Sequence, residues 1–313
     1  MGNSQSKQST VAPKHRLAVD PSTTAPSGVK TDTQTIHGRT FHDIKSPYFL
    51  PKDDEESDRL HEEHFLIKEG LGGNVLGHDL LAKKLQDGAM VLDIGCGPGT
   101  WLLDLATEYP SSLFNGLDIA SVFPNQIRPP NVSFKVADAR DELPYEPNTF
   151  DLVQVRLMVT AFRANEWEKV YRNVYRVLKP GGYVQIIEPD LRLCCERDKL
   201  ISDFSAKVAD FQQKRMQDPD ITRKLTTILD HSNFHVVIKE RLQTPLGWSS
   251  TLHKIAGDDY IRGMKAAAPL VAREFELSVP EYERMLNEIS SRFAGAKTYI
   301  NCLICLAQKP STQ

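Results

Sequence analysis

The chain has 313 residues, of which 40% are hydrophobic and 25% are charged, and its formal net charge is −3 at pH 7. This length can bury one large hydrophobic core or two modest ones, and the slightly acidic charge balance argues against a nucleic-acid-binding surface. The sequence has neither an apolar run near the ~20 residues of a membrane span nor a recognisable signal peptide. We therefore expect a soluble, cytoplasmic protein.

Residues 1–38 form a polar segment rich in Ser, Thr, Gln, Pro and Lys. Such a segment buries too little apolar surface to offset its ordering entropy, so it is predicted to be a disordered tail. Its first seven residues read MGNSQSK and match the M-G-x-x-x-[ST] pattern, which would place a myristoyl group on Gly2. The alternative is a chance glycine. Because a single myristoyl chain binds membranes weakly, we expect reversible membrane association.

Residues 39–88 are interpreted as an N-terminal helical cap. The acidic residues at 53–56 favour the first turn of a helix that runs to about Glu69. Gly70, Gly72 and Gly73 are predicted to end this helix, because no strand precedes them. The helix could be a capped surface helix or a lid over a ligand pocket.

A glycine-rich turn follows the next predicted strand. A short apolar run ends at Asp93, Gly95, Gly97 and Gly99 alternate after it, and residues 101–109 have helical periodicity. Glycine lets the backbone approach a ligand closely, and the helix that follows directs its N–H groups toward a carboxylate or phosphate. The pattern therefore predicts a cofactor-binding turn between strand and helix.

Two cofactor classes use such a turn, and the spacing of the glycines separates them. The dinucleotide fingerprint requires G-x-G-x-x-G or Ala. Here Thr100 occupies the last position and the third glycine, Gly99, comes one residue early. The pattern D-x-G-x-G-x-G instead resembles motif I of the class I methyltransferases, which use S-adenosylmethionine (SAM).

Acidic residues also end the next two predicted strands. Strand 113–117 leads to Asp118, where doubly wound folds place the carboxylate that binds ribose hydroxyls. Strand 132–136 leads to Asp138, which could accept a hydrogen bond from an adenine amino group. The apolar run at 150–157 is typical of a central parallel strand that is buried on both faces.

Strands and helices alternate along the rest of the chain, which predicts a parallel sheet covered on both faces. The first of these elements are a helix at 167–178 and a strand at 183–188. Later ones are helical segments at 196–216, 219–231, 251–275 and 282–293, and strands at 235–242 and 298–307.

The chain has five cysteines, which is an odd number and gives no disulfide framework. Cys302 and Cys305 form a C-x-x-C pattern inside an apolar run that is predicted to be a buried strand. No second cysteine pair or histidine cluster accompanies them, so we predict structural cysteines and no metal site.

These motifs stand in the order found in class I SAM-dependent methyltransferases, which the chain resembles over residues 89–190. Residues 48–59 and 245–248 resemble a fungal branch that includes regulators of secondary metabolism. The resemblance implies an α/β, Rossmann-like methyltransferase fold: a doubly wound, seven-stranded, mostly parallel sheet with helical cap insertions. The last strand would be antiparallel, between the fifth and sixth. The domain would span 89–313, with insertions at 191–215 and 247–275.

The same resemblance implies SAM as the cofactor and gives roles to particular residues. Asp93 would organise the loop and the methionine amino group. The residues that would meet the rest of the cofactor are Gly95, Gly97 and Gly99 for close backbone approach, Asp118 for the ribose diol, Ile119 for the adenine face, and Asp138 and Ala139 for the adenine edge. Arg156 would face an acceptor, or is a surface arginine.

The implied reaction is transfer of the SAM methyl group to an O, N, S or C nucleophile of a small-molecule acceptor. The catalytic base is unassigned, since His231, His235 and His253 are candidates by residue type alone. The alternative is a SAM-binding regulator of low turnover that acts through protein partners. An NAD-dependent oxidoreductase is disfavoured by Thr100 and the early third glycine.

Overall fold

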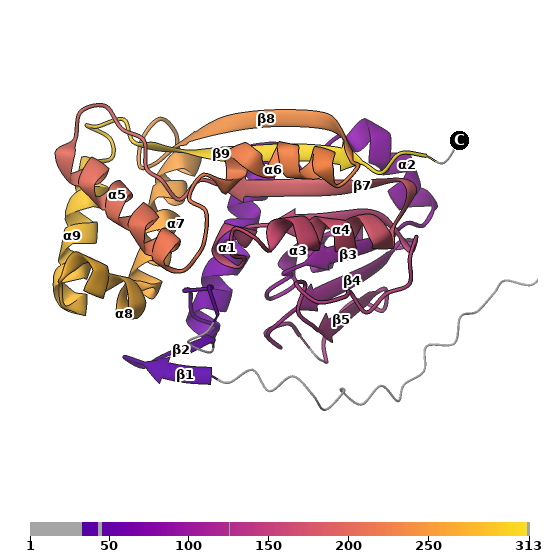
Figure 1. Cartoon of the computed structure of the whole chain (residues 1–313), viewed down its shortest axis with the longest axis horizontal. Coiled ribbons are helices and arrows are strands. Elements are labelled where there is room, and N and C mark those ends of the chain that lie inside the picture. The colour runs from indigo at the N-terminus through magenta and orange to yellow at the C-terminus, as the bar shows by residue number, and fades with distance from the viewer. Residues whose placement is uncertain (1–32, 43–45, 125, 312–313) are drawn as a thin grey trace, which may run out of the picture. The chain divides into compact units, whose positions relative to one another are not determined.

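A seven-stranded sheet forms the centre of the computed structural model, which describes residues 33–42, 46–124 and 126–311 (Figure 1). Its strand order is β5-β4-β3-β6-β7-β9-β8. The strands are β3 (Met90–Ile94), β4 (Leu113–Asp118), β5 (Val132–Val136), β6 (Phe150–Arg156), β7 (Leu178–Pro189), β8 (His235–Pro245) and β9 (Tyr299–Gln308).

Five neighbouring strands run parallel, and β9 lies antiparallel between β7 and β8. The predicted fold is therefore confirmed, including the last strand between the fifth and sixth strands of this sheet. In the register, Asp93 on β3 pairs with Gly116 on β4 and with Gln154 on β6. The ends of these three strands consequently meet at one edge of the sheet.

Helices cover both faces of the sheet, as a doubly wound fold requires. On one face, α2 (His78–Asp87) and α3 (Thr100–Glu108) bury a leucine- and tryptophan-rich surface against β3 and β4. On the other face, α4 (Trp167–Val177) and α6 (Ile221–His231) pack against the central strands. The five apolar residues of α4 that face the sheet have no solvent exposure: Trp167, Val170, Tyr171, Val174 and Val177.

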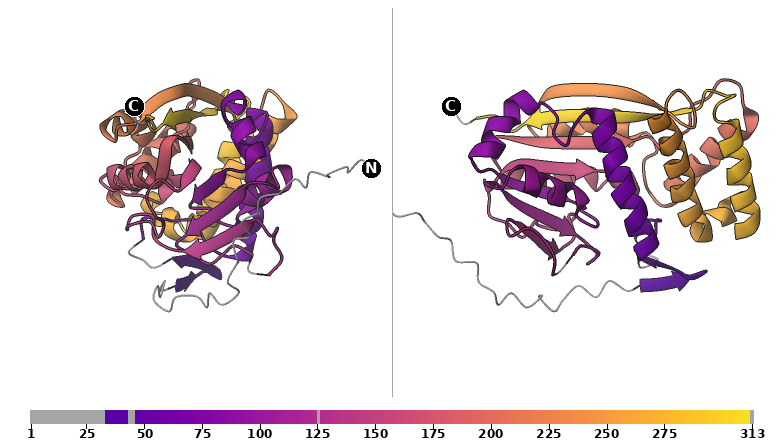
Figure 2. Two further views of the ribbon diagram at one scale, coloured as in Figure 1. Left: turned by 90° about the vertical axis from the view of Figure 1, so that its right-hand side faces the viewer. Right: turned by 180° about the vertical axis from the view of Figure 1, so that it is seen from behind.

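A second hydrophobic core lies among the helices beyond the ends of the parallel strands (Figure 2). It is formed by α5 (Lys199–Lys214), α7 (Thr251–Ala266), α8 (Ala268–Val271), η2 (Ala272–Phe275) and α9 (Val279–Arg292). The segments expected as helical insertions thus carry α5, α7, α8 and η2. Helix α1 (Asp54–Leu71) runs alongside and contacts both α7 and α3.

The limits of α1 agree with its sequence signals. Asp53 caps the first turn by accepting a hydrogen bond from the backbone N–H of Glu56 at 3.1 Å. Gly72 ends the helix with a φ of 70°, a left-handed conformation that favours glycine.

Two features of the N-terminal part differ from the prediction. Strand β1 (Thr33–Ile36) lies inside the segment expected to be tail, and it pairs with β2 (Arg39–His42). This hairpin is held by Asp53, which forms an ion pair with Arg39 at 2.7 Å and accepts from the Thr40 N–H. Helix α2 lies within residues 39–88, the segment predicted to be a helical cap, but it packs on the sheet as part of the main fold.

Candidate functional site

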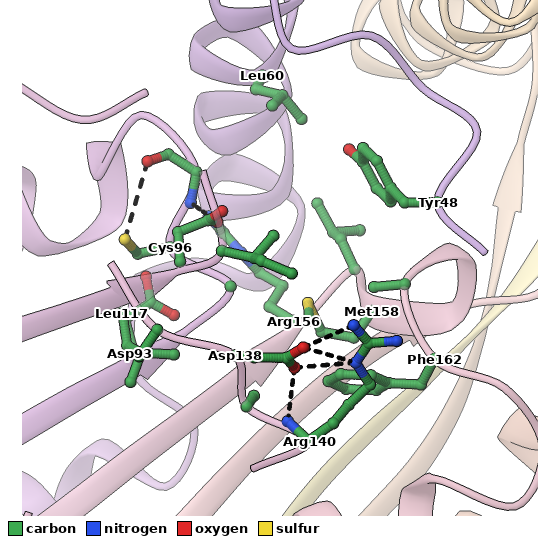
Figure 3. Close-up of a pocket in the computed structure, with 18 of the residues that line it drawn as sticks. Tyr48, Leu60, Asp93, Cys96, Leu117, Asp138, Arg140, Arg156, Met158 and Phe162 are labelled. Atoms are coloured by element: carbon green, nitrogen blue, oxygen red, sulfur yellow. Dashed lines mark hydrogen bonds and ion pairs between the residues drawn. The ribbon is translucent and has the colours of Figure 1, made fainter. Parts of the chain in front are cut away.

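The glycine-rich turn and the strand-ending acids surround one cavity at the edge where β3, β4 and β6 end (Figure 3). Eight residues proposed from the sequence line it: Asp93, Gly95, Gly97, Asp118, Ile119, Asp138, Ala139 and Arg156. The structure therefore brings together residues that span more than sixty positions of the chain. We call this space the first cavity.

The backbone of the turn is tied to the neighbouring strand. The N–H groups of Gly95 and Cys96 both donate to the Leu117 carbonyl, at 2.8 and 3.1 Å. Gly95 has a φ of 71°, and a Cβ there would lie 2.3 Å from the Met158 sulfur. The left-handed conformation favours glycine at this position, and a side chain there would displace the Met158 thioether.

Gly99 lies outside the first cavity, although the sequence suggested close approach to a ligand. Its φ is 78°, and an added Cβ would lie 2.6 Å from the Phe134 ring on β5. The absence of a side chain lets α3 begin directly against the sheet, since Gly99 is its N-cap. The structure accounts for this glycine by packing.

Asp118 is fixed by two backbone donors at the end of β4. Its carboxylate oxygens accept from the N–H of Gly97 at 2.9 Å and of Ala120 at 2.8 Å. Burial raises the pKa of Asp118, and these hydrogen bonds oppose the rise. The carboxylate is therefore held in place beside the glycine turn.

Asp93 is a buried acid that accepts one long hydrogen bond from the neighbouring strand β6. Its side chain is 4% exposed and accepts from the Gln154 amide at 3.4 Å. Burial raises its pKa to about 7, and the positive charge of Arg156 opposes that rise. Arg156 is half-buried in the cavity wall, so its interpretation as a surface arginine is wrong.

Asp138 is held by an arginine two residues later, as Figure 3 shows. Arg140 donates to both carboxylate oxygens at 2.6 to 3.0 Å and adds its backbone N–H at 2.9 Å. Burial would raise the pKa of Asp138, but the Arg140 contacts bring it below its usual value. A ligand at this edge would have to share the carboxylate with Arg140.

A second cavity of about 400 Å³ lies between the sheet and the helices of the second core. Its walls come from α1, α7 and the ends of β7, β8 and β9 nearest to these helices. Most of its lining is apolar, including Phe49, Leu66, Ile67, Leu246, Met264 and Ile304. A pocket of this kind suits a small, largely apolar molecule.

Leu157 lines both cavities and so lies between them. It has a φ of 61°, which is unusual for leucine. The turn that follows is η1 (Met158–Thr160), and its N–H groups at Met158 and Val159 donate to the Glu188 carboxylate at 2.9 and 3.0 Å. Glu188 is fully buried, and burial raises its pKa to about 8. This acid holds the turn between the cavities.

A charged cluster forms one wall of the second cavity. The Arg59 guanidinium contacts Glu56 at 2.7 Å, Asp259 at 3.1 Å and Glu63 at 3.3 Å. The spacing of Glu56, Arg59 and Glu63 puts them on one face of α1. This spacing is visible in the sequence and could have indicated the cluster. Asp259 comes from α7, 200 residues away, so only the fold reveals it.

The three histidines considered as bases fall in different places. His253 lines the second cavity and lies 2.9 Å from the Ser250 hydroxyl. His231 and His235 are exposed and line neither cavity.

The cysteines of the C-x-x-C pattern lie on opposite faces of β9, as side chains three positions apart must on a strand. Cys302 lines the second cavity, while Cys305 belongs to the core of the sheet.

Two further points concern membranes. Gly2, the proposed acylation site, lies outside the described residues. Within the described part of the chain, no helix combines the length and apolarity needed to cross a bilayer.

Comparison with known proteins gives a family match and several fungal relatives. A family described as "Methyltransferase domain" matches residues 91–182. The secondary metabolism regulator LAE1 of Cochliobolus heterostrophus is 25% identical over 228 residues, which cover 70% of this chain and 73% of that protein. The N-methyltransferase sirN of Leptosphaeria maculans is 38% identical over 150 residues, covering 47% of this chain and 51% of that protein.

A third relative carries a different activity in its name. The protein-methionine methyltransferase laeA of Emericella nidulans is 29% identical over 163 residues, covering 51% of this chain and 41% of that protein. The matches to sirN and laeA therefore span about half or less of those proteins. Three observations indicate a methyltransferase domain that binds a cofactor: the order of the strands, the glycine turn and the family match. The cofactor of this family is SAM. Residues 91–182 thus form a methyltransferase domain, and the chain resembles the class I SAM-dependent methyltransferases, in particular a fungal branch that includes regulators of secondary metabolism.

Proposed function

We propose that the protein transfers the methyl group of SAM to a small, largely apolar molecule held in the second cavity. The observation that carries this proposal is the position of Leu157, which lines both cavities. A cofactor in the first cavity and an acceptor in the second would meet at this residue. Proximity and exclusion of water are the main contributions a protein makes to such a reaction.

Different residues of the first cavity would bind different parts of the cofactor. Asp118 would bind the ribose diol, Ile119 would pack on the adenine, and Asp138 with Ala139 would meet the adenine edge. Asp93 would hold the methionine amino group. SAM supplies an activated methyl group on a sulfonium, and the chain supplies its alignment.

Arg156 belongs to the cofactor side in this proposal. It lines the first cavity, and its charge acts on Asp93. It would balance that buried carboxylate and would not contact the acceptor, in contrast to the role that the resemblance suggested.

The test is incubation of the purified protein with methyl-labelled SAM and a fungal cell extract, followed by separation of small molecules from protein. Label is expected in the small-molecule fraction, and Asp118→Ala should abolish it. The absence of label above the level of heat-inactivated protein would contradict the proposal.

A second candidate is supported by the names of the relatives. LAE1 is named a regulator and laeA a protein-methionine methyltransferase, so a protein acceptor or a regulatory role through protein partners is the alternative. The same experiment separates the two, because a protein acceptor would carry the label into the protein fraction.

A further inference from the structure

The polar part of the second cavity is concentrated on the wall that α1 and α7 share. Arg59 and Glu63 come from α1 and Asp259 from α7, and all three line the cavity. The rest of the lining is mainly apolar. A ligand in this cavity would therefore meet charge on one side.

The charges on this wall do not balance. Arg59 uses Nε and Nη2 to bind Glu56, at 3.1 and 2.7 Å, and uses Nη1 to bind both oxygens of Asp259 at 3.1 Å. Glu63 reaches only the same Nη1, at 3.3 Å. Three carboxylates thus surround one guanidinium. Burial raises the pKa of Glu56 and brings that of Asp259 to about 7, so bound protons offset part of the negative charge and the remainder is in excess.

The nearest additional cation does not remove this excess. Arg262 lies 3.5 Å from Asp259 but 2.5 Å from Glu62, an acid on the outer side of α1. The charge of Arg262 is therefore matched by Glu62. The excess negative charge remains beside the cavity, where Glu56, Arg59 and Asp259 are all buried.

Glu63 is the acid best placed to meet a ligand. Its side chain is 18% exposed, against 2% for Glu56 and 8% for Asp259. Its charge acts on Arg156 and Tyr48, which line the first cavity. Its charge also acts on Cys302 in the second cavity, so Glu63 is within electrostatic range of residues of both cavities.

Three other polar side chains of the cavity have their own partners. Asp190 accepts from Thr222 and is paired with Arg241. The Tyr260 hydroxyl donates to the Leu191 carbonyl at 3.1 Å, and His253 contacts Ser250. A neutral ligand would leave the charge of the α1 wall unmatched, which is costly in a buried site, whereas a cationic ligand would neutralise it.

We propose that the second cavity binds an apolar molecule bearing a basic amine, and that Glu63 pairs with its ammonium group. This inference rests on the proposed function, because it names the acceptor class for the same site. An ammonium proton passes to the Glu63 carboxylate and leaves a neutral amine with a free electron pair. That pair forms the new N–C bond as the methyl C–S bond breaks, its electrons stay on sulfur, and the positive charge moves to nitrogen.

The test compares two probes of the same shape, 4-benzylpiperidine and 4-benzyltetrahydropyran, which differ in an amine nitrogen and an ether oxygen. Their binding to the full chain saturated with S-adenosylhomocysteine is measured by calorimetry. The wild-type protein should bind the amine at least about tenfold more tightly, a difference of about 1.4 kcal/mol.

The variant Glu63→Gln keeps the size of the side chain and removes its charge, so it should bind the two probes about equally. Glu69→Gln is the matched control, since Glu69 is exposed on the same helix and lines neither cavity. It should keep the preference for the amine.

Equal affinity of the wild type for both probes, failure to bind either probe, or an unchanged preference in Glu63→Gln would overturn the inference. The wild-type comparison alone decides this if the variant does not fold. Mass spectrometry of 4-benzylpiperidine after incubation with SAM then addresses the proposed function separately. Selective binding without methylation would support the amine site and count against transfer. Transfer to a neutral acceptor from the fungal extract would support methyl transfer and count against the amine site.

Discussion

His64 on α1 lies against Arg156 at the end of β6, with 3.4 Å between His64 Nδ1 and Arg156 Nη1. Because a guanidinium can only donate, Nδ1 accepts this contact, and Nε2–H donates to Asp104 on α3 at 3.1 Å. The histidine is therefore neutral, and it connects α1 to the cofactor edge of the sheet. Lys68 and Asn74 also bind Asp104 and complete the attachment.

This arrangement predicts that His64 makes folding stability sensitive to acid. Burial and the nearby Arg156 lower the pKa of His64 to about 4 from its ordinary value of 6.5. Between these values the unfolded chain takes up a proton and the folded chain does not, so stability falls as the pH drops through this window. His64→Gln should be less stable at pH 7, and its deficit should shrink by about 1–2 kcal/mol at pH 5.

Denaturant unfolding at both pH values measures this effect. His231→Gln is the control, because His231 is exposed at the end of α6. It controls for the loss of an imidazole at the protein surface. A constant deficit for His64→Gln would show that its protonation is not coupled to folding.

Much of the sheet could be predicted because its strands have strong local signals. The apolar run at 150–157 fits β6, and the change from strand to helix at Asp93 fits β3 and α3. The role of Asp118 could be predicted because it ends the strand that follows the glycine turn, where doubly wound folds have a ribose-binding carboxylate. These features depend on residues close together in sequence.

The missed features depend on contacts between distant residues. Helix α2 buries only Leu81 and Leu85, which gives too few apolar positions for a clear period. Strand β1 lies in a polar segment, and its neighbour β2 is anchored by Asp53. The second cavity takes its lining from Phe49 through Ile304, so no local pattern could describe it.

Asp118→Ala should weaken binding of S-adenosylhomocysteine by at least about tenfold, because each charge-assisted hydrogen bond is worth about 1.5–3 kcal/mol. Calorimetry measures the affinity, and thermal unfolding checks that the turn survives the loss of the Gly97 and Ala120 contacts. The exposed Asp141→Ala serves as the control. Unchanged affinity in Asp118→Ala would show that Asp118 does not bind the ribose.

The glycines of the turn should separate packing from binding. Gly99→Ala should lower stability by about 2–4 kcal/mol, since it combines backbone strain with overpacking against Phe134. Its affinity for S-adenosylhomocysteine should stay near the wild-type value. Gly97→Ala, which has 3.8 Å of space before Leu60, should instead weaken binding because it points a methyl group toward the cavity. Weaker binding by Gly99→Ala, with unchanged binding by Gly97→Ala, would show that Gly99 and not Gly97 contacts the cofactor.

For Gly2 we propose N-myristoylation with reversible membrane attachment. Mass spectrometry of the protein expressed in a fungal host should find a fourteen-carbon acyl group on Gly2. Cell fractionation should show part of the wild-type protein, and none of Gly2→Ala, with membranes. Identical partitioning of the two proteins and an unmodified Gly2 would make the motif a coincidence.

Gly263 offers the most direct test of the central claim, that two adjoining cavities form one methyl-transfer site. It lies on α7 in the wall of the second cavity, and an added Cβ would come no closer than 3.8 Å to Arg59. Alanine and leucine are tolerated in a helix better than glycine, so Gly263→Ala and Gly263→Leu should fold while filling the cavity in two steps.

The measurement is transfer of label from SAM to the small-molecule fraction of the fungal extract, alongside affinity for S-adenosylhomocysteine. The account predicts that Gly263→Leu binds S-adenosylhomocysteine like the wild type but transfers label at least about tenfold more slowly, with Gly263→Ala between the two. Transfer at the wild-type rate by Gly263→Leu would contradict the account.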